Sequence, residues 1–203
     1  MIYFFMEASI LKEPILYKIL RPLMKTYTKL IFHPKIVGLE FIPKTDSVIL
    51  AGNHTSYNDW LPLISSTKRV VHFLAKDSLF KGIKKILFKN VGAIPVNRSI
   101  HDKNALKSAE KILQNGGVIA IFPEGTINRT KEVIMPFKIG AVKMAYDTNT
   151  PIIPFSITGK FKMFKNDLTI TFYEPLKVET KDLDEANDKL AKIIANGLER
   201  IKK

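Results

Sequence analysis

The chain has 203 residues, of which 46% are hydrophobic, with no cysteine and a formal net charge of +13. That length and apolar content predict one domain with a sizeable core, while the lack of cysteine excludes disulfides and thiolate metal sites. The charge is typical of a protein with a densely negative partner, either anionic lipid headgroups or nucleic acid, or of a merely basic soluble protein.

The first residues, MIYFFMEASILKEPIL, lack a basic n-region and a cleavage site of small residues. We therefore expect no secretory signal. No uncharged apolar run approaches the ~18–20 residues that span a bilayer, so we also expect no membrane span.

Residues 9–32 carry apolar side chains at helical spacing, which predicts helix. Pro14 and Pro22 interrupt the pattern, so two short helices or one kinked helix are expected. Basic residues lie between the apolar positions: Lys12, Lys18, Arg21, Lys25 and Lys29. Residues 1–33 therefore form an amphipathic segment, which either packs on the domain or lies in a membrane interface.

Seven segments after residue 34 read as strands, and helical stretches interleave with them. The strands are expected at 36–42, 47–51, 70–75, 92–97, 117–122, 151–157 and 168–173. The clearest helices are 100–115, with a candidate capping box at Ser99-Ile100-His101-Asp102, and 182–201. This alternation predicts an α/β fold for residues 34–203: a single layered domain with a mostly parallel or mixed central sheet flanked by helices. Ligands of such sheets bind at the carboxyl ends of the strands.

The stretch AGNHTSYNDW follows one of these strands and places His54 five residues before Asp59. Residues five apart diverge by about 140° on a helix and point to opposite faces of a strand. The pair can meet only if the chain turns between them, and Pro62 places a helix start near Asn58 or Asp59. A carboxylate there could orient the histidine as a base, or Asp59 could simply cap the helix.

Two further polar stretches follow predicted strands. Phe122-Pro123-Glu124-Gly125-Thr126 comes after an apolar run and contains a glutamate that a plain turn does not require. Gly92-Ala93-Ile94-Pro95-Val96-Asn97-Arg98 ends in an arginine, whose planar guanidinium suits phosphate oxygens.

The blocks NHTSYND, GAIPVNR, FPEGT and PIIPFSITG, in this order, resemble the glycerolipid acyltransferase family. Its best-known members are 1-acyl-sn-glycerol-3-phosphate (lysophosphatidic acid) acyltransferases, which make phosphatidic acid. The match covers roughly residues 35–175. Two positions depart from the family pattern: Ile127 stands where many members have arginine, and Asn58 replaces a commonly apolar residue.

The resemblance implies that His54 is the general base and that Asp59 orients it. It implies a site for the phosphorylated acceptor formed by Lys76, Arg98, Glu124, Gly125, Thr126 and Arg129. It also gives Pro154 a structural or acyl-pocket role, and it favours membrane docking by residues 1–33.

The expected reaction is direct transfer of an acyl chain from an acyl thioester to the free hydroxyl of lysophosphatidic acid. The donor is acyl carrier protein or coenzyme A, and no cysteine exists to form an acyl-enzyme. Backbone N–H groups near Gly52 to Thr55, or near Gly125, are candidate oxyanion donors. The four histidines show no metal-ligand spacing, so we expect no metal and no cofactor. The protein is expected at the cytoplasmic face of the cell membrane, bound peripherally to its anionic surface.

Two alternatives stay open. Because of Ile127, the acceptor could instead be another lysolipid or glycerol-3-phosphate. A non-catalytic basic protein that binds membrane or RNA is the more remote alternative. The sequence has no RNP-type aromatic motif, no KH-type G-x-x-G clamp and no zinc ligands, so we expect no nucleic-acid partner.

Overall fold

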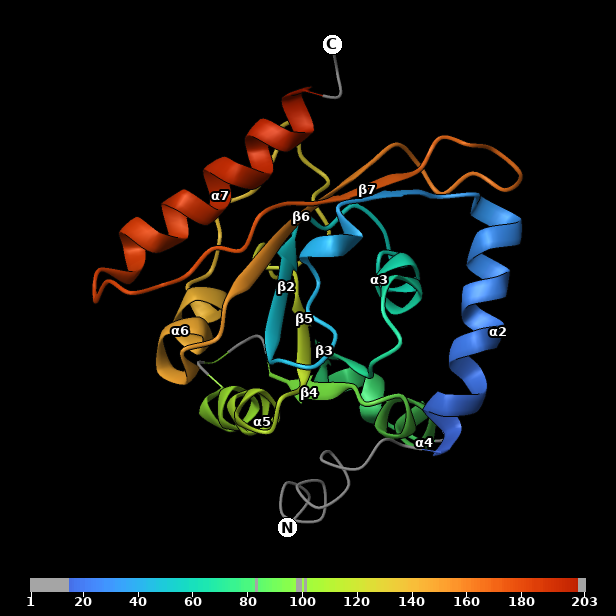
Figure 1. Ribbon diagram of the computed structural model, residues 1–203. Helices are drawn as coiled ribbons and strands as arrows, with labels where there is room; N and C mark the ends of the chain where they lie inside the picture. Colours follow the sequence, from blue (N-terminus) through green and yellow to red (C-terminus); the bar gives the residue numbers. More distant parts are fainter. Residues whose placement is uncertain (1–14, 83, 98–99, 101, 201–203) are drawn as a thin grey trace.

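The computed structural model describes residues 15–82, 84–97, 100 and 102–200. These residues build a seven-stranded mixed sheet with helices on both faces (Figure 1), which confirms the expected α/β layered domain. The strands, in chain order, are β1 (Lys35–Val37), β2 (Val48–Gly52), β3 (Val71–Lys76), β4 (Ile94–Val96), β5 (Val118–Ile121), β6 (Ile152–Thr158) and β7 (Thr169–Phe172).

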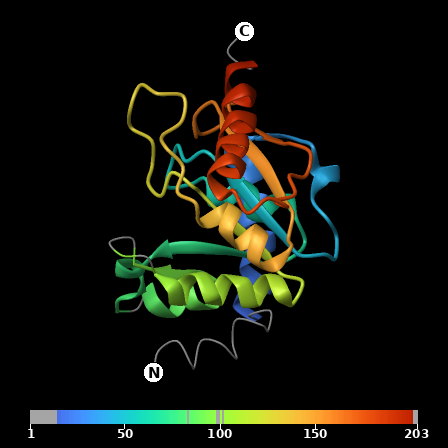
Figure 2. The ribbon, with the colours of Figure 1, turned by 90° about the vertical axis from the view of Figure 1, so that its left-hand side faces the viewer.

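Two groups of helices cover the sheet. The helices are α2 (Ile15–Phe32), α3 (Trp60–Ser66), α4 (Lys84–Asn90), α5 (Lys103–Gln114), α6 (Gly140–Thr148) and α7 (Leu183–Arg200), with short 3₁₀ turns η1 (Leu39–Phe41) and η2 (Asp77–Phe80). Helices α5, α6 and α7 lie on one face, whereas α2 and α3 lie on the other (Figures 1 and 2).

Strand β2 shows why the central strands are continuous apolar runs. Val48 and Leu50 belong to the core beneath α2 and α3, and Ile49 and Ala51 belong to the core beneath α5, α6 and α7. Successive strand residues point to opposite faces, so a strand covered on both sides must be apolar throughout.

The sheet order is β1-β7-β6-β2-β5-β3-β4. Strand β2 pairs in parallel with β5 and β6, and β3 pairs in parallel with β5 and β4. The carboxyl ends of these five strands therefore share one edge of the sheet. β7 runs antiparallel to β6 and β1 parallel to β7, which makes the sheet mixed.

All seven predicted strands are present, and two predicted boundaries are wrong. The strand expected at 36–42 ends at Val37, because Gly38 takes a left-handed conformation (φ 77°) that leads into η1. The helix expected from residue 100 begins at Lys103, and the carboxylate of Asp102 caps it by accepting from the N–H groups of Asn104 and Ala105. Ser99, the first residue of the expected capping box, lies outside the described residues.

Helix α2 runs through Pro22 as one helix, and residues 1–14 lie outside the described residues. It is part of the core: Tyr17, Thr28 and Phe32 are buried. The Tyr17 hydroxyl accepts from the Val71 N–H over 3.0 Å, so α2 is tied directly to the start of β3. Within the described ranges, no helix combines the length and the apolar character needed to cross a membrane.

Candidate active site

The register of two neighbouring strands brings the first and third motifs together. Ala51 of β2 pairs with Ile121 of β5, so the residues three positions beyond each, His54 and Glu124, emerge side by side. The backbone N–H of His54 donates to Oε1 of Glu124 over 2.8 Å. The parallel sheet thus joins two sequence motifs that lie 70 residues apart.

The chain turns between His54 and Asp59, as the sequence predicts. Nδ1 of His54 lies 2.8 Å from Oδ2 of Asp59, which is completely buried. Asp59 occupies the N-cap position of α3, yet its side chain makes no capping hydrogen bond. It points back into the turn and accepts from the Thr55 N–H (2.6 Å), the Ser56 N–H (2.9 Å) and the Thr55 hydroxyl (3.0 Å). The capping alternative is therefore wrong.

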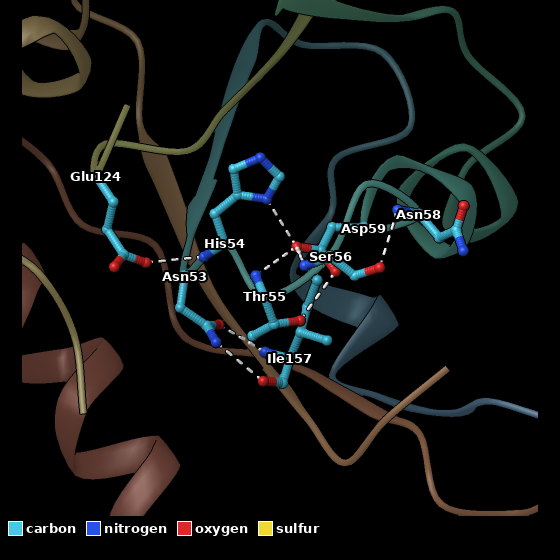
Figure 3. Close-up of polar contacts among 8 residues, drawn as sticks. All are labelled: Asn53, His54, Thr55, Ser56, Asn58, Asp59, Glu124 and Ile157. Carbon is cyan, nitrogen blue, oxygen red and sulfur yellow. Dashed lines mark hydrogen bonds and ion pairs between the residues drawn. The ribbon is translucent and has the colours of Figure 1, made fainter. Parts of the chain in front are cut away.

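These contacts define the tautomer of His54. An ionised carboxylate only accepts hydrogen bonds, so Nδ1 carries the proton and donates it to Asp59. Nε2 then holds a lone pair, and Figure 3 shows this second ring nitrogen pointing away from Asp59. The side chain is 14% exposed, and a ring nitrogen with a free lone pair is a group that can accept a proton.

Two neighbours hold His54 in place. The ring of Phe122 stacks on the imidazole with centroids 4.2 Å apart and planes 13° apart. On the other side of the turn, the buried Asn53 side chain donates to the Ile157 carbonyl (2.9 Å) and accepts from the Ile157 N–H (2.7 Å). Asn53 thereby joins the end of β2 to β6 (Figure 3). The stacking on Phe122 and the hydrogen bond to Asp59 together set the orientation of the ring, with Nε2 directed away from Asp59 (Figure 3).

Glu124 uses both carboxylate oxygens on backbone N–H groups. Oε1 accepts from His54 and Oε2 accepts from Met135 over 2.9 Å. The same loop returns to the histidine, because the Asn128 N–H donates to the His54 carbonyl over 2.8 Å. Residues 126–138 are thus fastened to the backbone of the candidate base at both its N–H and its C=O.

The other expected site residues lie at the same edge of the sheet, with one exception. Lys76 ends β3 and is exposed. Gly125 has φ 72°, and a Cβ there would come within 2.9 Å of Cε of Lys138. Thr126 and Arg129 are exposed, and Nη2 of Arg129 lies 3.5 Å from the Tyr57 hydroxyl, above the turn that contains His54. Arg98 lies outside the described residues.

The backbone groups suggested as oxyanion donors are mostly engaged. The N–H groups of His54, Thr55 and Gly125 donate to Glu124, Asp59 and the Phe122 carbonyl. These three N–H groups therefore hold the shape of the turns, and the oxyanion donor itself stays a prediction. Among the described residues, no group of three or more His, Asp or Glu side chains is arranged to bind a metal ion.

The sequence alone indicates no role for Asn53, Phe122 or Tyr57. Asn53 and Phe122 are the residues that directly precede the candidate base and the Pro-Glu-Gly turn. The feature that could have identified them is their place in the sequence, just past the end of a predicted strand. In neighbouring parallel strands of matched register, residues at such places lie close together. Tyr57 gave no comparable signal, since its link to Arg129 joins two loops.

Comparison with known proteins identifies the protein family to which this chain belongs. The family model described as Acyltransferase matches residues 33–158, well over half of the chain. The chain therefore belongs to the acyltransferase family, as the four sequence blocks predicted.

Two curated relatives carry the same name, 1-acyl-sn-glycerol-3-phosphate acyltransferase. The protein from Borreliella burgdorferi is 39% identical over 132 residues, which make up 64% of this chain and 52% of the relative. The protein from Bacillus subtilis is 30% identical over 168 residues, covering 79% of this chain and 82% of the relative. The chain thus spans about half the length of the first and most of the second.

A solved structure shares the fold. The crystal structure of the 1-acyl-sn-glycerophosphate (LPA) acyltransferase PlsC from Thermotoga maritima superposes with a TM-score of 0.73. The match covers 92% of this chain and 81% of that one, at 23% sequence identity. This likeness supports the sheet order and helix layers described above.

Proposed function

We propose that this chain transfers an acyl group from an acyl thioester to the free hydroxyl of 1-acyl-glycerol-3-phosphate, giving phosphatidic acid. The observation that carries the proposal is the hydrogen bond between His54 and the buried Asp59, which leaves Nε2 as a base. The names of the Borreliella and Bacillus relatives support the choice of acceptor.

The reaction needs one proton acceptor. An alcohol is a poor nucleophile because its pKa is close to that of water and lies far above neutral pH. In the proposed step, Nε2 of His54 takes the hydroxyl proton while the oxygen bonds to the thioester carbonyl carbon. The C–S bond then breaks, and the sulfur leaves as a thiol with the proton from His54. Base catalysis of this kind contributes about 10²- to 10⁴-fold.

The acceptor phosphate is proposed to lie beside Arg129 and Lys76, with Thr126, Gly125 and Arg98 completing its site. Arg129 is supported by its place above the turn of His54. Glu124 takes a different part, since a carboxylate repels a phosphate and its oxygens already accept two backbone N–H groups. We propose that Glu124 shapes the acceptor site by fixing the loop that carries Arg129.

The direct test supplies purified protein with lysophosphatidic acid and either acyl-coenzyme A or acyl carrier protein loaded with the same chain. Thiol release and the phosphatidic acid formed are measured together. We expect equal amounts of both products with at least one donor. Parallel reactions replace the acceptor with glycerol-3-phosphate or another lysolipid. Faster turnover there would overturn the acceptor assignment, and no thiol release with any acceptor would overturn the acyl-transfer proposal.

We propose that the protein docks peripherally on the cytoplasmic surface of the membrane, and the exposed side chains of α2 support attachment to an anionic bilayer. One face of α2 exposes a row of apolar side chains, here called the α2 stripe, each between 46% and 78% exposed. The α2 stripe consists of Ile15, Ile19, Leu23, Tyr27 and Leu30. Lys18, Lys25 and Lys29 are exposed on the same helix, and each could contribute about 1 kcal/mol near anionic headgroups. Arg21 is directed inward, donating to the Thr67 carbonyl.

Point substitutions test this docking better than a deletion, because Tyr17 and Phe32 of α2 belong to the core. The variant I19S/L23S should keep its fold and bind anionic vesicles at least tenfold more weakly, since about 1.5–3 kcal/mol accompanies full burial of each large aliphatic side chain. Unchanged binding to vesicles that contain phosphatidylglycerol would refute docking through α2.

A further inference from the structure

A second cationic and apolar element lies at the active-site end of the molecule. The loop that joins β6 to β7, residues 159–168, reads GKFKMFKNDL, so lysines alternate with large apolar residues. It follows the carboxyl end of β6, the strand that Asn53 ties to the turn of His54. Figures 1 and 2 show it at the same end of the molecule as the carboxyl end of β6.

The loop is fastened to the fold on both sides. Thr158 and Thr169 pair across its base, and a Cβ at Gly159, whose φ is 78°, would collide with the Asp167 carbonyl. Lys162 forms an ion pair with Asp167 over 3.0 Å. The Phe164 N–H donates to the Ile31 carbonyl at the end of α2 over 2.6 Å. The fold therefore holds this loop in a defined place.

Its two central apolar side chains are nevertheless presented to solvent. Met163 is 59% exposed and Phe164 is 66% exposed. Phe164 also has φ 57°, a left-handed conformation that bulky residues rarely adopt. Strained backbone of this kind persists where the surrounding structure imposes it, and it gathers at functional positions. Two adjacent large apolar residues displayed in this way indicate a partner that buries them.

The loop is continuous with the α2 stripe through a chain of aromatic rings. Tyr27, a member of the stripe, contacts Phe32 edge to face at 5.8 Å, and Phe32 contacts Phe161 of the loop in the same way at 5.3 Å. The loop therefore packs against the end of α2 that carries Tyr27 and Leu30 of the stripe. Lys160 and Lys165 flank the apolar tip and are both exposed.

From these contacts we propose that residues 160–165 form a second membrane-contact element, in which Met163 and Phe164 enter an anionic bilayer and Lys160 and Lys165 meet its phosphates. Apolar tips between cations fit the boundary between acyl chains and anionic headgroups. The inference rests on the proposed docking of α2, and it specifies how the protein is oriented on the membrane. The protein is then attached to the membrane by α2 and by residues 160–165, which lie beside the carboxyl ends of the strands. These two attachments turn His54 toward the membrane that holds the lysolipid.

The first experiment reports on the loop itself and needs no enzyme activity. The chain has no cysteine, so Met163→Cys accepts one polarity-sensitive fluorophore. Lys107→Cys is the matched control, because Lys107 is exposed on α5, which covers the face of the sheet opposite α2 (Figure 1). On adding phosphatidylglycerol vesicles, we expect a blue shift of the label at position 163 and none at 107. No shift at 163, or equal shifts at both positions, would overturn the proposal.

The second experiment measures function with the variant M163S/F164N. Asparagine tolerates left-handed backbone well, so the variant should fold. Vesicle binding should fall about tenfold, and turnover of lysophosphatidic acid in vesicles should fall with it. Turnover of a short-chain, monomeric lysophosphatidic acid should not change. Wild-type vesicle binding by this variant would refute the inference, as would a dimer seen by sedimentation in the wild type and lost in the variant. Lack of wild-type turnover would instead count against the proposed reaction and leave the fluorescence result standing.

Discussion

Glu124 holds the backbone of His54 rather than its ring: the His54 N–H lies 2.8 Å from Oε1. Because Oε2 accepts from Met135, one buried carboxylate connects the turn after β2 to the loop after β5. The acidic residue of the Phe-Pro-Glu-Gly block is thus placed to fix the position of His54 and the path of the loop that carries Arg129.

Replacing Glu124 with glutamine tests this arrangement. An amide has one oxygen, so its NH₂ group must face one of the two backbone N–H donors, and a buried hydrogen bond is lost at about 1–3 kcal/mol. We expect kcat to fall by roughly 10- to 100-fold, with a smaller change in the KM for lysophosphatidic acid. Steady-state kinetics with each substrate varied in turn measure both.

The matched control for this change is Glu132→Gln, since Glu132 is exposed on the same loop. It should leave kcat and both KM values close to wild type. A rise in the acceptor KM at unchanged kcat in Glu124→Gln would mean that Glu124 contacts the acceptor directly.

Substitution of His54 or Asp59 should lower activity more than Glu124→Gln does. His54→Ala removes the proton acceptor and should lower kcat by about 10²- to 10⁴-fold. Asp59→Asn should also lose most activity, because its NH₂ group would face N–H donors and would no longer hold the proton on Nδ1. His33→Asn, at an exposed position with φ 42°, is the control. Circular dichroism verifies the fold, and more than a tenth of wild-type turnover in His54→Ala would rule out the general-base role.

Much of this fold could be predicted because its signals are local. Apolar runs such as Val48–Leu50 and Val118–Ala120 belong to strands buried on both faces, and their pattern needs no knowledge of partners. The turn between His54 and Asp59 followed from spacing and from Pro62. The end of β1 at Val37 did not follow, because the chain conformation there depends on Gly38, where any side chain would press on the Phe172 carbonyl of β7.

The contacts that complete the site are long-range, and the sequence could not supply them. Asn53 reaches Ile157 and Glu124 reaches His54 only because β2 lies between β5 and β6 in a particular register. The same is true of Arg21, which reads as a headgroup ligand in the sequence but donates to Thr67. Side-chain type suggested the chemistry, while the register determined which group meets which.

Arg129 is predicted to act on the acceptor alone. If its guanidinium holds the phosphate, Arg129→Ala should raise the KM for lysophosphatidic acid by about 10- to 150-fold, as expected for a charged hydrogen bond worth about 1.5–3 kcal/mol. The KM for the thioester should stay the same. Lys131→Ala, exposed on the same loop, is the control and should change neither value. Equal losses for donor and acceptor would indicate that Arg129 supports the loop through Tyr57 instead.

His72 is predicted to make the fold sensitive to acid. It is buried in β3, and desolvation lowers its pKa from the ordinary value of 6.5, although its hydrogen bond to the Gly92 carbonyl acts in the opposite direction. In the folded state the ring therefore stays neutral at pH values where the unfolded chain already binds a proton. Because the unfolded state then holds more protons, the free energy of unfolding must fall as the pH drops below about 6.5, by at most about 1.4 kcal/mol per pH unit from this group. Urea unfolding of the wild type and of His72→Gln between pH 5 and 8 measures the difference. The variant should lose that part of the slope, whereas His33→Asn, at an exposed histidine, should keep it; equal slopes in the wild type and His72→Gln would contradict the prediction.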